Sequence, residues 1–198
     1  PVTGQVSVQG GDQGRVFVGV FLARSDDGQR SGERVLQRQN GILLALAKDT
    51  SIDDGDLAVA LRALTEAAAS GMGCARASVW MYDAGRTKIT CEDLFERASG
   101  QHSSGIELSR AIFPGYFEAL AESRQIVAND AHEHPATREF SASYLTPLGI
   151  VSMLDAPIRL HGETVGVLCH EHIGLPRAWT QEEQTFAGSV ADVVSRAL

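Results

Sequence analysis

Apolar residues recur along the chain with two different periods, and each period predicts one kind of element. Over residues 53–71 and 181–198 they recur every three or four positions, which predicts amphipathic helices. The second helix has Thr180 as its N-cap and Glu183 three residues later, a spacing typical of a capping box. A further helix is predicted over residues 33–47. These helices flank a region with the pattern of a β-sheet.

Strand-like runs with turn signals between them predict two β-hairpins. The clearer hairpin joins residues 150–160 to residues 163–172 through His161-Gly162, a dipeptide suited to a two-residue turn. Because hairpins form antiparallel pairs, the layout is α+β and not doubly wound. The remaining predictions are a hairpin of residues 75–82 and 88–95, a polar mobile loop at 98–109, strands at 15–22 and 125–128, and helices at 114–122 and 138–145.

The helix predicted over residues 33–47 also has the spacing of a coiled-coil seam. Leu36, Gln39, Leu43 and Leu46 follow one another at intervals of three and four residues, with Gln39 as the polar position. The seam covers only two heptads, so it indicates a helical linker and not a long coiled coil.

Charge and hydropathy narrow the range of partners. The 198 residues carry a formal net charge of −8 at pH 7. An acidic chain gains nothing from counterion release at phosphates, so we expect no nucleic-acid binding and no docking on an anionic membrane. No apolar run is long enough to span a bilayer. We therefore expect a cytoplasmic protein with no membrane insertion in this chain.

The cysteines and histidines do not form a recognisable metal or redox motif. Cys74, Cys91 and Cys169 are widely spaced, so no zinc knuckle and no redox dithiol is predicted. Two His-Glu-His triplets, at residues 132–134 and 170–172, could supply metal ligands only if the fold brings them together. Surface or hydrogen-bonded histidines are the simpler interpretation, and we predict no metal site.

The second half of the chain resembles a GAF domain. The resemblance rests on Tyr144-Leu145, on Gly149 through Ile158, on Gly166 through His172, and on Pro176-Arg177-Ala178-Trp179. It extends over about residues 40–198. It implies a six-stranded antiparallel sheet with the N- and C-terminal helices on one face. It also implies a ligand pocket on the other face, roofed by loops and short helices.

The start of the chain resembles the end of a PAS domain. A strand at residues 14–21 is followed by a charged helix that ends at residues 37–40, although Ala23-Arg24-Ser25 replaces the usual Asp-Ile-Thr. The alternative is a leader strand. The predicted divisions are a tail or PAS-like strand at 1–32, a helical linker at 33–50 and the GAF domain at 51–198. The resemblance implies a fragment of a bacterial multi-domain signalling protein such as a two-component histidine kinase or a cyclic-di-GMP enzyme.

Strand alternation and the resemblance together select the pocket residues. Alternation places Met153 with Asp155 on one strand face, and Cys169 with Glu171 on the partner strand. In bilin-binding GAF domains the position matching Glu171 carries a histidine that contacts the chromophore, so the resemblance assigns this face to the pocket. The predicted ligand-binding set is Trp80, Phe113, Tyr116, Arg138, Tyr144, Met153, Asp155, Cys169 and Glu171.

Two carboxylates on one buried face need compensation. Neither Asp155 nor Glu171 stays ionised in an apolar wall without a partner. Arg138, Arg110 or a ligand cation could compensate them, or one carboxylate could hold a proton. The alternatives are that Glu171 lies in solvent or pairs with Arg177, and that Asp155 accepts hydrogen bonds from backbone amides of a nearby loop.

Two familiar GAF ligands are disfavoured, and the ligand remains unknown. Phe140 and Ser141 stand where one type of bilin-binding relative has a Cys-His pair, which argues against a covalent bilin. The Asn-Lys-Phe-Asp-Glu signature of cyclic-nucleotide-binding GAF domains does not occur in the chain, which argues against a cyclic nucleotide.

Three functions are compatible with the sequence. The first is a sensory domain that binds a small ligand and relays the signal through its terminal helices as a homodimer. The second is a dimerisation and relay module whose vestigial pocket is filled by Trp80, Tyr116 and Tyr144. The third is a cysteine-based free methionine sulfoxide reductase that uses Cys91 and Cys169. We expect no catalytic residue and no enzyme activity in this chain.

Overall fold

The computed structural model describes residues 4–10, 16–22, 26–52 and 56–198. The chain divides into two compact units, Pro1–Arg38 and Gln39–Leu198. In the first unit, strands β1 (Gly4–Gly10) and β2 (Val16–Leu22) form an antiparallel hairpin. The predicted PAS-like segment, residues 1–32, lies partly outside the described residues. Within the described part of the chain, no helix combines the length and the apolar character needed to cross a membrane.

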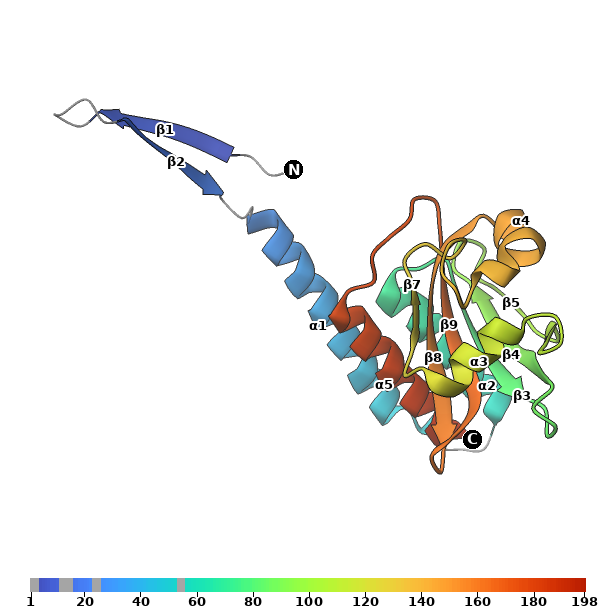
Figure 1. Ribbon diagram of the computed structural model, residues 1–198. Coiled ribbons are helices and arrows are strands. Elements are labelled where there is room, and N and C mark those ends of the chain that lie inside the picture. The colour runs from blue at the N-terminus through green and yellow to red at the C-terminus, as the bar shows by residue number, and fades with distance from the viewer. Residues whose placement is uncertain (1–3, 11–15, 23–25, 53–55) are drawn as a thin grey trace. The chain divides into compact units, whose positions relative to one another are not determined.

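The second unit is built around an antiparallel sheet (Figure 1). Its strand order is β5-β4-β3-β9-β8-β7, with β6 also paired to β4, which gives seven strands among the described residues. Residues 98–109 were predicted as a mobile loop, but they contain the two short strands β5 and β6, which both pair with β4. The strands are β3 (Arg76–Tyr82), β4 (Lys88–Glu96), β5 (Gln101–Ser103), β6 (Glu107–Ser109), β7 (Ile126–Ala128), β8 (Ile150–Leu160) and β9 (Glu163–Ile173).

The hairpin of β8 and β9 lies within this sheet as the sequence predicts. His161 has φ 53° and Gly162 has φ 87°, so both turn residues adopt the left-handed conformation that a type I′ turn requires. Gly166 on β9 allows β3 to approach closely, because a Cβ there would lie 2.3 Å from the Trp80 carbonyl oxygen. The hairpin therefore fixes which residues of β8 and β9 point to each face.

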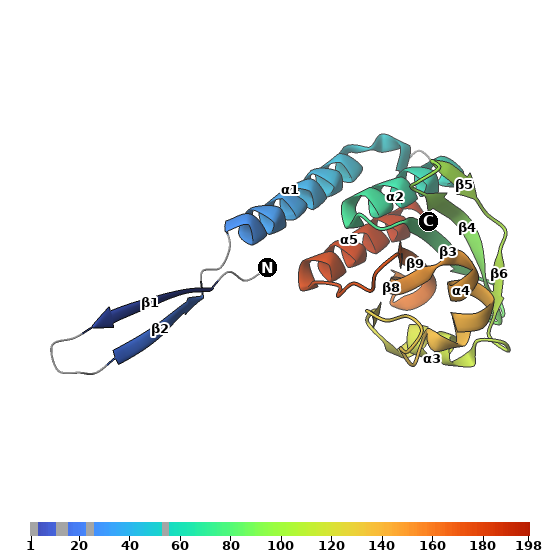
Figure 2. The ribbon, with the colours of Figure 1, turned by 90° about the horizontal axis from the view of Figure 1, so that it is seen from above.

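Helices α2 (Leu57–Met72) and α5 (Gln181–Ala197) cover one face of the sheet (Figure 2). The capping box at the start of α5 is confirmed: the Glu183 amide donates to Thr180 Oγ1 at 3.3 Å and the Thr180 amide donates to Glu183 Oε2 at 3.0 Å. Phe186 of α5 lies against Gly71 of α2, where a Cβ would be 2.2 Å from the ring. The two helices pack too closely for any side chain at that point.

Helix α1 (Asp26–Lys48) contains the predicted coiled-coil seam and is followed by a short 3₁₀ helix, η1 (Thr50–Ile52). Gln39 is buried and its amide donates to the Gly71 carbonyl oxygen at 3.4 Å. Leu46 is buried in the core beneath α2 and α5, whereas Leu36 is exposed. The C-terminal part of the seam therefore packs within its own domain.

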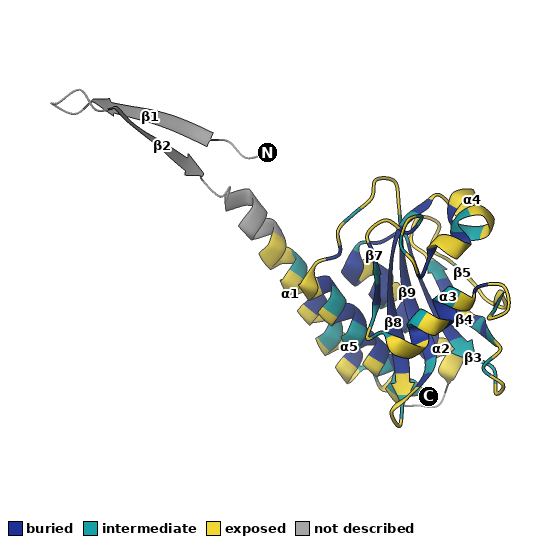
Figure 3. Ribbon diagram, viewed as in Figure 1, coloured by how far each residue is buried: buried dark blue, intermediate teal, exposed yellow. Residues whose placement is uncertain are grey.

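Short helices cover the opposite face of the sheet. They are α3 (Pro114–Glu122), the 3₁₀ helix η2 (Arg138–Phe140), the π-helix η3 (Ser141–Leu145) and the single turn α4 (Thr146–Leu148). The sequence predicts one helix over residues 138–145, but the structure divides this stretch into a 3₁₀ part and a π part. We call these short helices, residues 113–122 and 138–148, the roof. Figure 3 shows buried residues along the central strands and exposed residues on α4.

Candidate functional site

Two buried carboxylates lie on the sheet face beneath the roof. Asp155 on β8 has no exposed surface and Glu171 on β9 is 1% exposed. In the register of the hairpin, Asp155 lies opposite Cys169, and Met153 lies opposite Glu171. The predicted sharing of one face by these four residues is therefore confirmed, and both acids are removed from water.

Arg76 on β3 compensates the charge of Glu171. Its Nε lies 3.3 Å from Glu171 Oε2, and the Tyr144 hydroxyl donates to Glu171 Oε1 at 2.7 Å. Burial raises the pKa of Glu171, while the Arg76 charge and the Tyr144 hydrogen bond oppose that rise. The suggested pairing of Glu171 with Arg177 is wrong, because Arg177 forms its ion pair with Glu183.

No cation in the described part of the chain compensates Asp155 in this way. The Tyr116 hydroxyl donates to Asp155 Oδ2 at 2.8 Å, and the Cys169 sulfur lies 3.7 Å from the same hydroxyl. Among the described residues, Asp155 Oδ1 has no hydrogen-bond partner. Burial raises the pKa of Asp155 to about 7, and Tyr116 and Cys169 offset that rise only in part. Backbone amides do not satisfy Asp155, contrary to the alternative considered from sequence.

Aromatic side chains separate the two carboxylates from solvent. The Phe140 ring lies 4.6 Å from Phe113, 4.7 Å from Tyr116 and 6.1 Å from Tyr144, measured between ring centroids. The cavity between these rings and the sheet has a volume of about 10 Å³. A cavity of that size holds at most one water molecule. Its lining residues are Trp80, Leu108, Tyr116, Phe140, Tyr144, Met153, Cys169 and Glu171.

The structure brings together most of the predicted site residues. Six of them line the cavity, whereas Asp155 does not line it but accepts a hydrogen bond from Tyr116, which does. Phe113 is buried against Phe140 but does not line the cavity. Arg138 is a correction: it is exposed on the outer side of η2, so it compensates neither carboxylate. Arg110 is also exposed, with its guanidinium over the Phe117 ring.

Sequence reasoning missed Arg76, Leu108 and Phe140 as site residues. Arg76 could have been found, because counting back from Trp80 in steps of two along the strand gives Ser78 and then Arg76 on the same face. Phe140 could not, since its burial depends on how the roof folds over the sheet.

The cysteines and histidines are placed as structural residues. Cys74, Cys91 and Cys169 are buried and form no disulfide. Burial raises the pKa of the Cys74 and Cys91 thiols to about 12. His170 is buried, with Nδ1 2.9 Å from the Leu154 carbonyl oxygen. No group of three or more histidine, cysteine or acidic side chains among the described residues is arranged to hold a metal ion.

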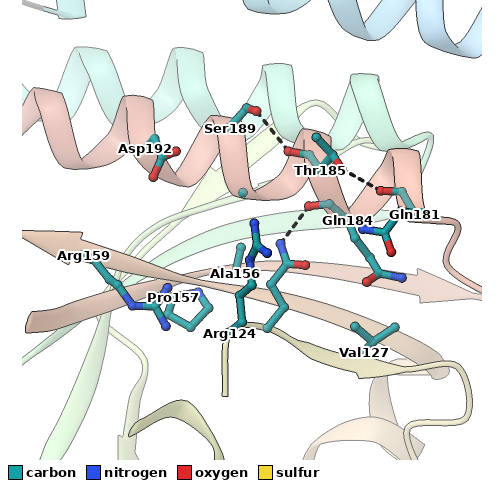
Figure 4. Close-up of a pocket in the computed structure, with 12 residues that line it drawn as sticks. Arg124, Val127, Ala156, Pro157, Arg159, Gln181, Gln184, Thr185, Ser189 and Asp192 are labelled. Atoms are coloured by element: carbon teal, nitrogen blue, oxygen red, sulfur yellow. Dashed lines mark hydrogen bonds between the residues drawn. The ribbon is translucent and has the colours of Figure 1, made fainter. Parts of the chain in front are cut away.

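A larger, polar groove lies between α5 and the strands β7 and β8 (Figure 4). Its volume is about 510 Å³, and the Gln125 side-chain amide crosses it to donate to the Gln184 carbonyl oxygen at 2.7 Å. Arg124, Arg159 and Asp192 supply exposed charges. None of the predicted site residues lines this groove, and it contains no buried ionisable group.

Solved structures share this architecture at low sequence identity. The GAF domain of a phosphoenolpyruvate-protein phosphotransferase from Coxiella burnetii aligns with a TM-score of 0.63 and 17% identity, over 81% of this chain and 92% of that chain. The phycocyanobilin-bound GAF domain of a cyanobacterial phytochrome aligns with a TM-score of 0.65 and 17% identity, over 79% of this chain and 91% of that chain. The chromophore-binding domain of Stigmatella aurantiaca bacteriophytochrome aligns with a TM-score of 0.62 and 15% identity, over 98% of this chain and 68% of that chain. At these identities the likeness concerns the fold.

The family assignment rests on a sequence-based match. No curated protein matches the chain at the significance required. The family model of the GAF domain matches residues 56–198, which comprise the whole sheet, α2, α5 and the roof. Since this match covers most of the chain, the protein belongs to the GAF domain family, whose members are in general regulatory and sensory modules.

Proposed function

We propose that residues 56–198 are the sensory domain of a cytoplasmic bacterial signalling protein and bind a small ligand between the sheet and the roof. The observation that carries the proposal is Asp155, a fully buried carboxyl group with one oxygen that has no partner among the described residues. Burying a polar group without a hydrogen bond costs about 1–3 kcal/mol in proteins. A ligand that satisfies this oxygen would recover that cost.

The roof is the part of the domain best suited to admit a ligand. It consists of one nine-residue helix and three short turns with 3₁₀, π and α hydrogen bonding. π-Helical segments occur often at functional sites, and short irregular segments open at lower free energy than the core. With a cavity of only about 10 Å³, binding requires that Phe140 or Tyr144 move outward. The ligand would thus select an open state of the roof.

Strand β8 provides a route from the pocket to the helices. Its Met153 and Asp155 face the roof, while Leu154, Ala156 and Ile158 pack in the core beneath α5. A shift of β8 on ligand binding would change the packing of α5. We propose that the terminal helices relay this change in a homodimer, for which Leu44 on α1 and Val59 on α2 offer exposed apolar surface.

The parent protein is proposed to be a histidine kinase or a cyclic-di-GMP enzyme. The alignment with the Stigmatella aurantiaca domain extends over 98% of this chain, whereas those with the two isolated GAF domains cover 79% and 81%. This difference supports the interpretation that residues 1–32 belong to a segment that precedes the GAF domain in a multi-domain protein.

One observation favours a second function, a relay module with a vestigial pocket. The cavity is filled by the domain's own side chains, and its volume of about 10 Å³ excludes any organic ligand in this conformation. The third candidate, a cysteine-based reductase, receives no support, since catalysis needs an accessible thiolate of low pKa and burial raises the pKa of Cys169 well above its usual value.

Ligand capture tests the proposal. We would express the whole chain natively, identify co-purifying molecules by mass spectrometry, and screen metabolites for a change in melting temperature. The sensory function predicts a stoichiometric ligand or a stabilising metabolite whose effect disappears in Tyr116→Phe. The matched control is Gln125→Ala in the polar groove, which should keep the response. If no molecule binds and no metabolite shifts melting, the vestigial-pocket alternative replaces the proposal.

A further inference from the structure

The charges of the ionisable groups around the cavity do not sum to zero when Asp155 is ionised. Glu171 is paired with Arg76, so together they carry no net charge. Asp155 receives only neutral donors, the Tyr116 hydroxyl and the nearby Cys169 thiol. Burial raises the pKa of the Cys169 and Tyr116 groups, so neither adds a charge at neutral pH. One cation would therefore neutralise the charge that Asp155 leaves in the site.

The geometry also leaves one acceptor open. Asp155 Oδ2 accepts from Tyr116, whereas Oδ1 is buried with no hydrogen-bond partner among the described residues. When it is ionised, the carboxylate only accepts hydrogen bonds, so a ligand that matches this form presents an N–H or O–H donor. An anionic ligand would be repelled at this position, and a neutral donor would leave the carboxylate charge uncompensated.

The aromatic wall favours the same ligand class. Four aromatic side chains line the cavity: Trp80, Tyr116, Phe140 and Tyr144. A cation within about 6 Å of such rings is attracted by the negative face of the ring, and more strongly when it is desolvated. The Arg76 guanidinium already lies 5.8 Å from the centroid of the Tyr144 ring. The wall can therefore stabilise a second, smaller cation beside Asp155.

We infer that the pocket takes a compact primary amine, whose ammonium group donates a hydrogen bond to Asp155 Oδ1 and lies against the aromatic rings. This inference rests on the proposed sensory function and specifies its ligand class. The cavity of about 10 Å³ sets a size limit, because it has room for no more than one group of the size of a water molecule, which is also about the size of an ammonium head. Small amines require the least displacement of Phe140 and Tyr144.

The chain contains a built-in reporter for this site. It has two tryptophans, Trp80 beside the cavity and Trp179 in the core of the other face. In a Trp179→Phe background, fluorescence reports on the cavity alone. We would titrate this protein with ethylamine and benzylamine, and with ethanol and benzyl alcohol as neutral isosteres. Asp155→Asn, which keeps the side-chain shape but removes the charge, is compared with the groove variant Gln125→Ala.

We expect both amines to change Trp80 fluorescence and the alcohols to leave it unchanged. Asp155→Asn should weaken amine binding at least tenfold, while Gln125→Ala should leave it unaltered. Binding should also be tighter at pH 8 than at pH 5, because the carboxyl must be ionised.

Two other outcomes separate the inference from the proposed function. If neutral or anionic metabolites bind and Asp155→Asn binds them equally well, the amine inference is overturned and the sensory function stands. If no compound of any charge changes fluorescence or melting temperature, both fail. Far-UV circular dichroism of Asp155→Asn without ligand checks in either case that the variant is folded.

Discussion

The two faces of the sheet use the same strands for different kinds of interior. Under α2 and α5 the buried set is mainly apolar, with Leu64, Leu154 and Phe186 at its centre, although Thr65 and His170 are also buried on this side. Under the roof, aromatic side chains surround Arg76, Asp155 and Glu171. Because apolar packing stabilises a fold without any need for compensating partners, the helix-covered face provides the stability.

The ion pair buried under the roof has a desolvation cost. Replacing buried ion pairs with apolar residues of similar volume is often neutral or stabilising, so stability alone does not require Arg76 and Glu171. The unpartnered oxygen of Asp155 adds to that cost. The contrast indicates that the helix-covered face maintains the fold and that the face under the roof is specialised for recognition.

The sharpest test of the helix-covered face is Phe186→Ala. Phe186 is buried, and Gly71 opposite has no side chain that could fill the space. We expect the free energy of unfolding to fall by about 3–5 kcal/mol, as for other buried Phe→Ala changes, in urea denaturation. Phe186→Leu keeps most of the volume and should lose much less. Equal losses for the two variants would show that packing volume is not what matters there.

For the face under the roof, Arg76→Met tests whether charge pairing is the main constraint. The change leaves Glu171 buried with only the Tyr144 hydroxyl as a donor, and removing one partner of a buried pair costs about 3–5 kcal/mol. The double variant Arg76→Met/Glu171→Gln removes both charges and should recover most of that loss. If chemical denaturation shows no recovery, the pair acts through packing and not through charge.

Asp155→Asn tests the cost of the uncompensated carboxyl. The pKa of Asp155 is about 7 in the folded chain, against about 3.9 when unfolded, so the folded state binds the proton more tightly. The contribution of Asp155 to the free energy of unfolding is complete below about pH 4 and is lost as the pH rises to about 7, a fall of about 2–4 kcal/mol. In urea denaturation between pH 4 and pH 8, the free energy of unfolding should fall less with rising pH in the variant than in the unsubstituted chain. An unchanged slope would mean that Asp155 does not titrate in this range.

The smallest effect is expected at the start of α5. Thr180→Ala removes the side-chain oxygen that accepts from the Glu183 amide, and the loss of such a cap costs about 1 kcal/mol. Thermal unfolding measures the loss. Thr180→Ser keeps the acceptor and is the control. Ligand binding under the roof should be unaffected by either variant, since Thr180 belongs to the helix-covered side.

Local patterns predicted the elements whose partners are close in sequence. The turn at His161-Gly162 and the cap at Thr180 depend on neighbouring residues, and both were confirmed. The strands at residues 101–103 and 107–109 were missed, because their polar side chains resemble a loop and only pairing with β4 orders them. Residues 138–145 were predicted as one helix from their local pattern. Their hydrogen bonding also depends on how they pack against the sheet, which the local pattern does not show.

The sequence by itself determined the type of each main element and which residues of β8 share a face, since alternation and helical spacing are local properties of the chain. It placed Asp155 and Glu171 together on that basis. Only the tertiary structure decided that Arg76 neutralises Glu171 while Asp155 has no cation, because that depends on the register between β3 and β9. It also decided that the pocket is closed, since the aromatic rings come from segments far apart along the chain and their packing is set by the whole fold.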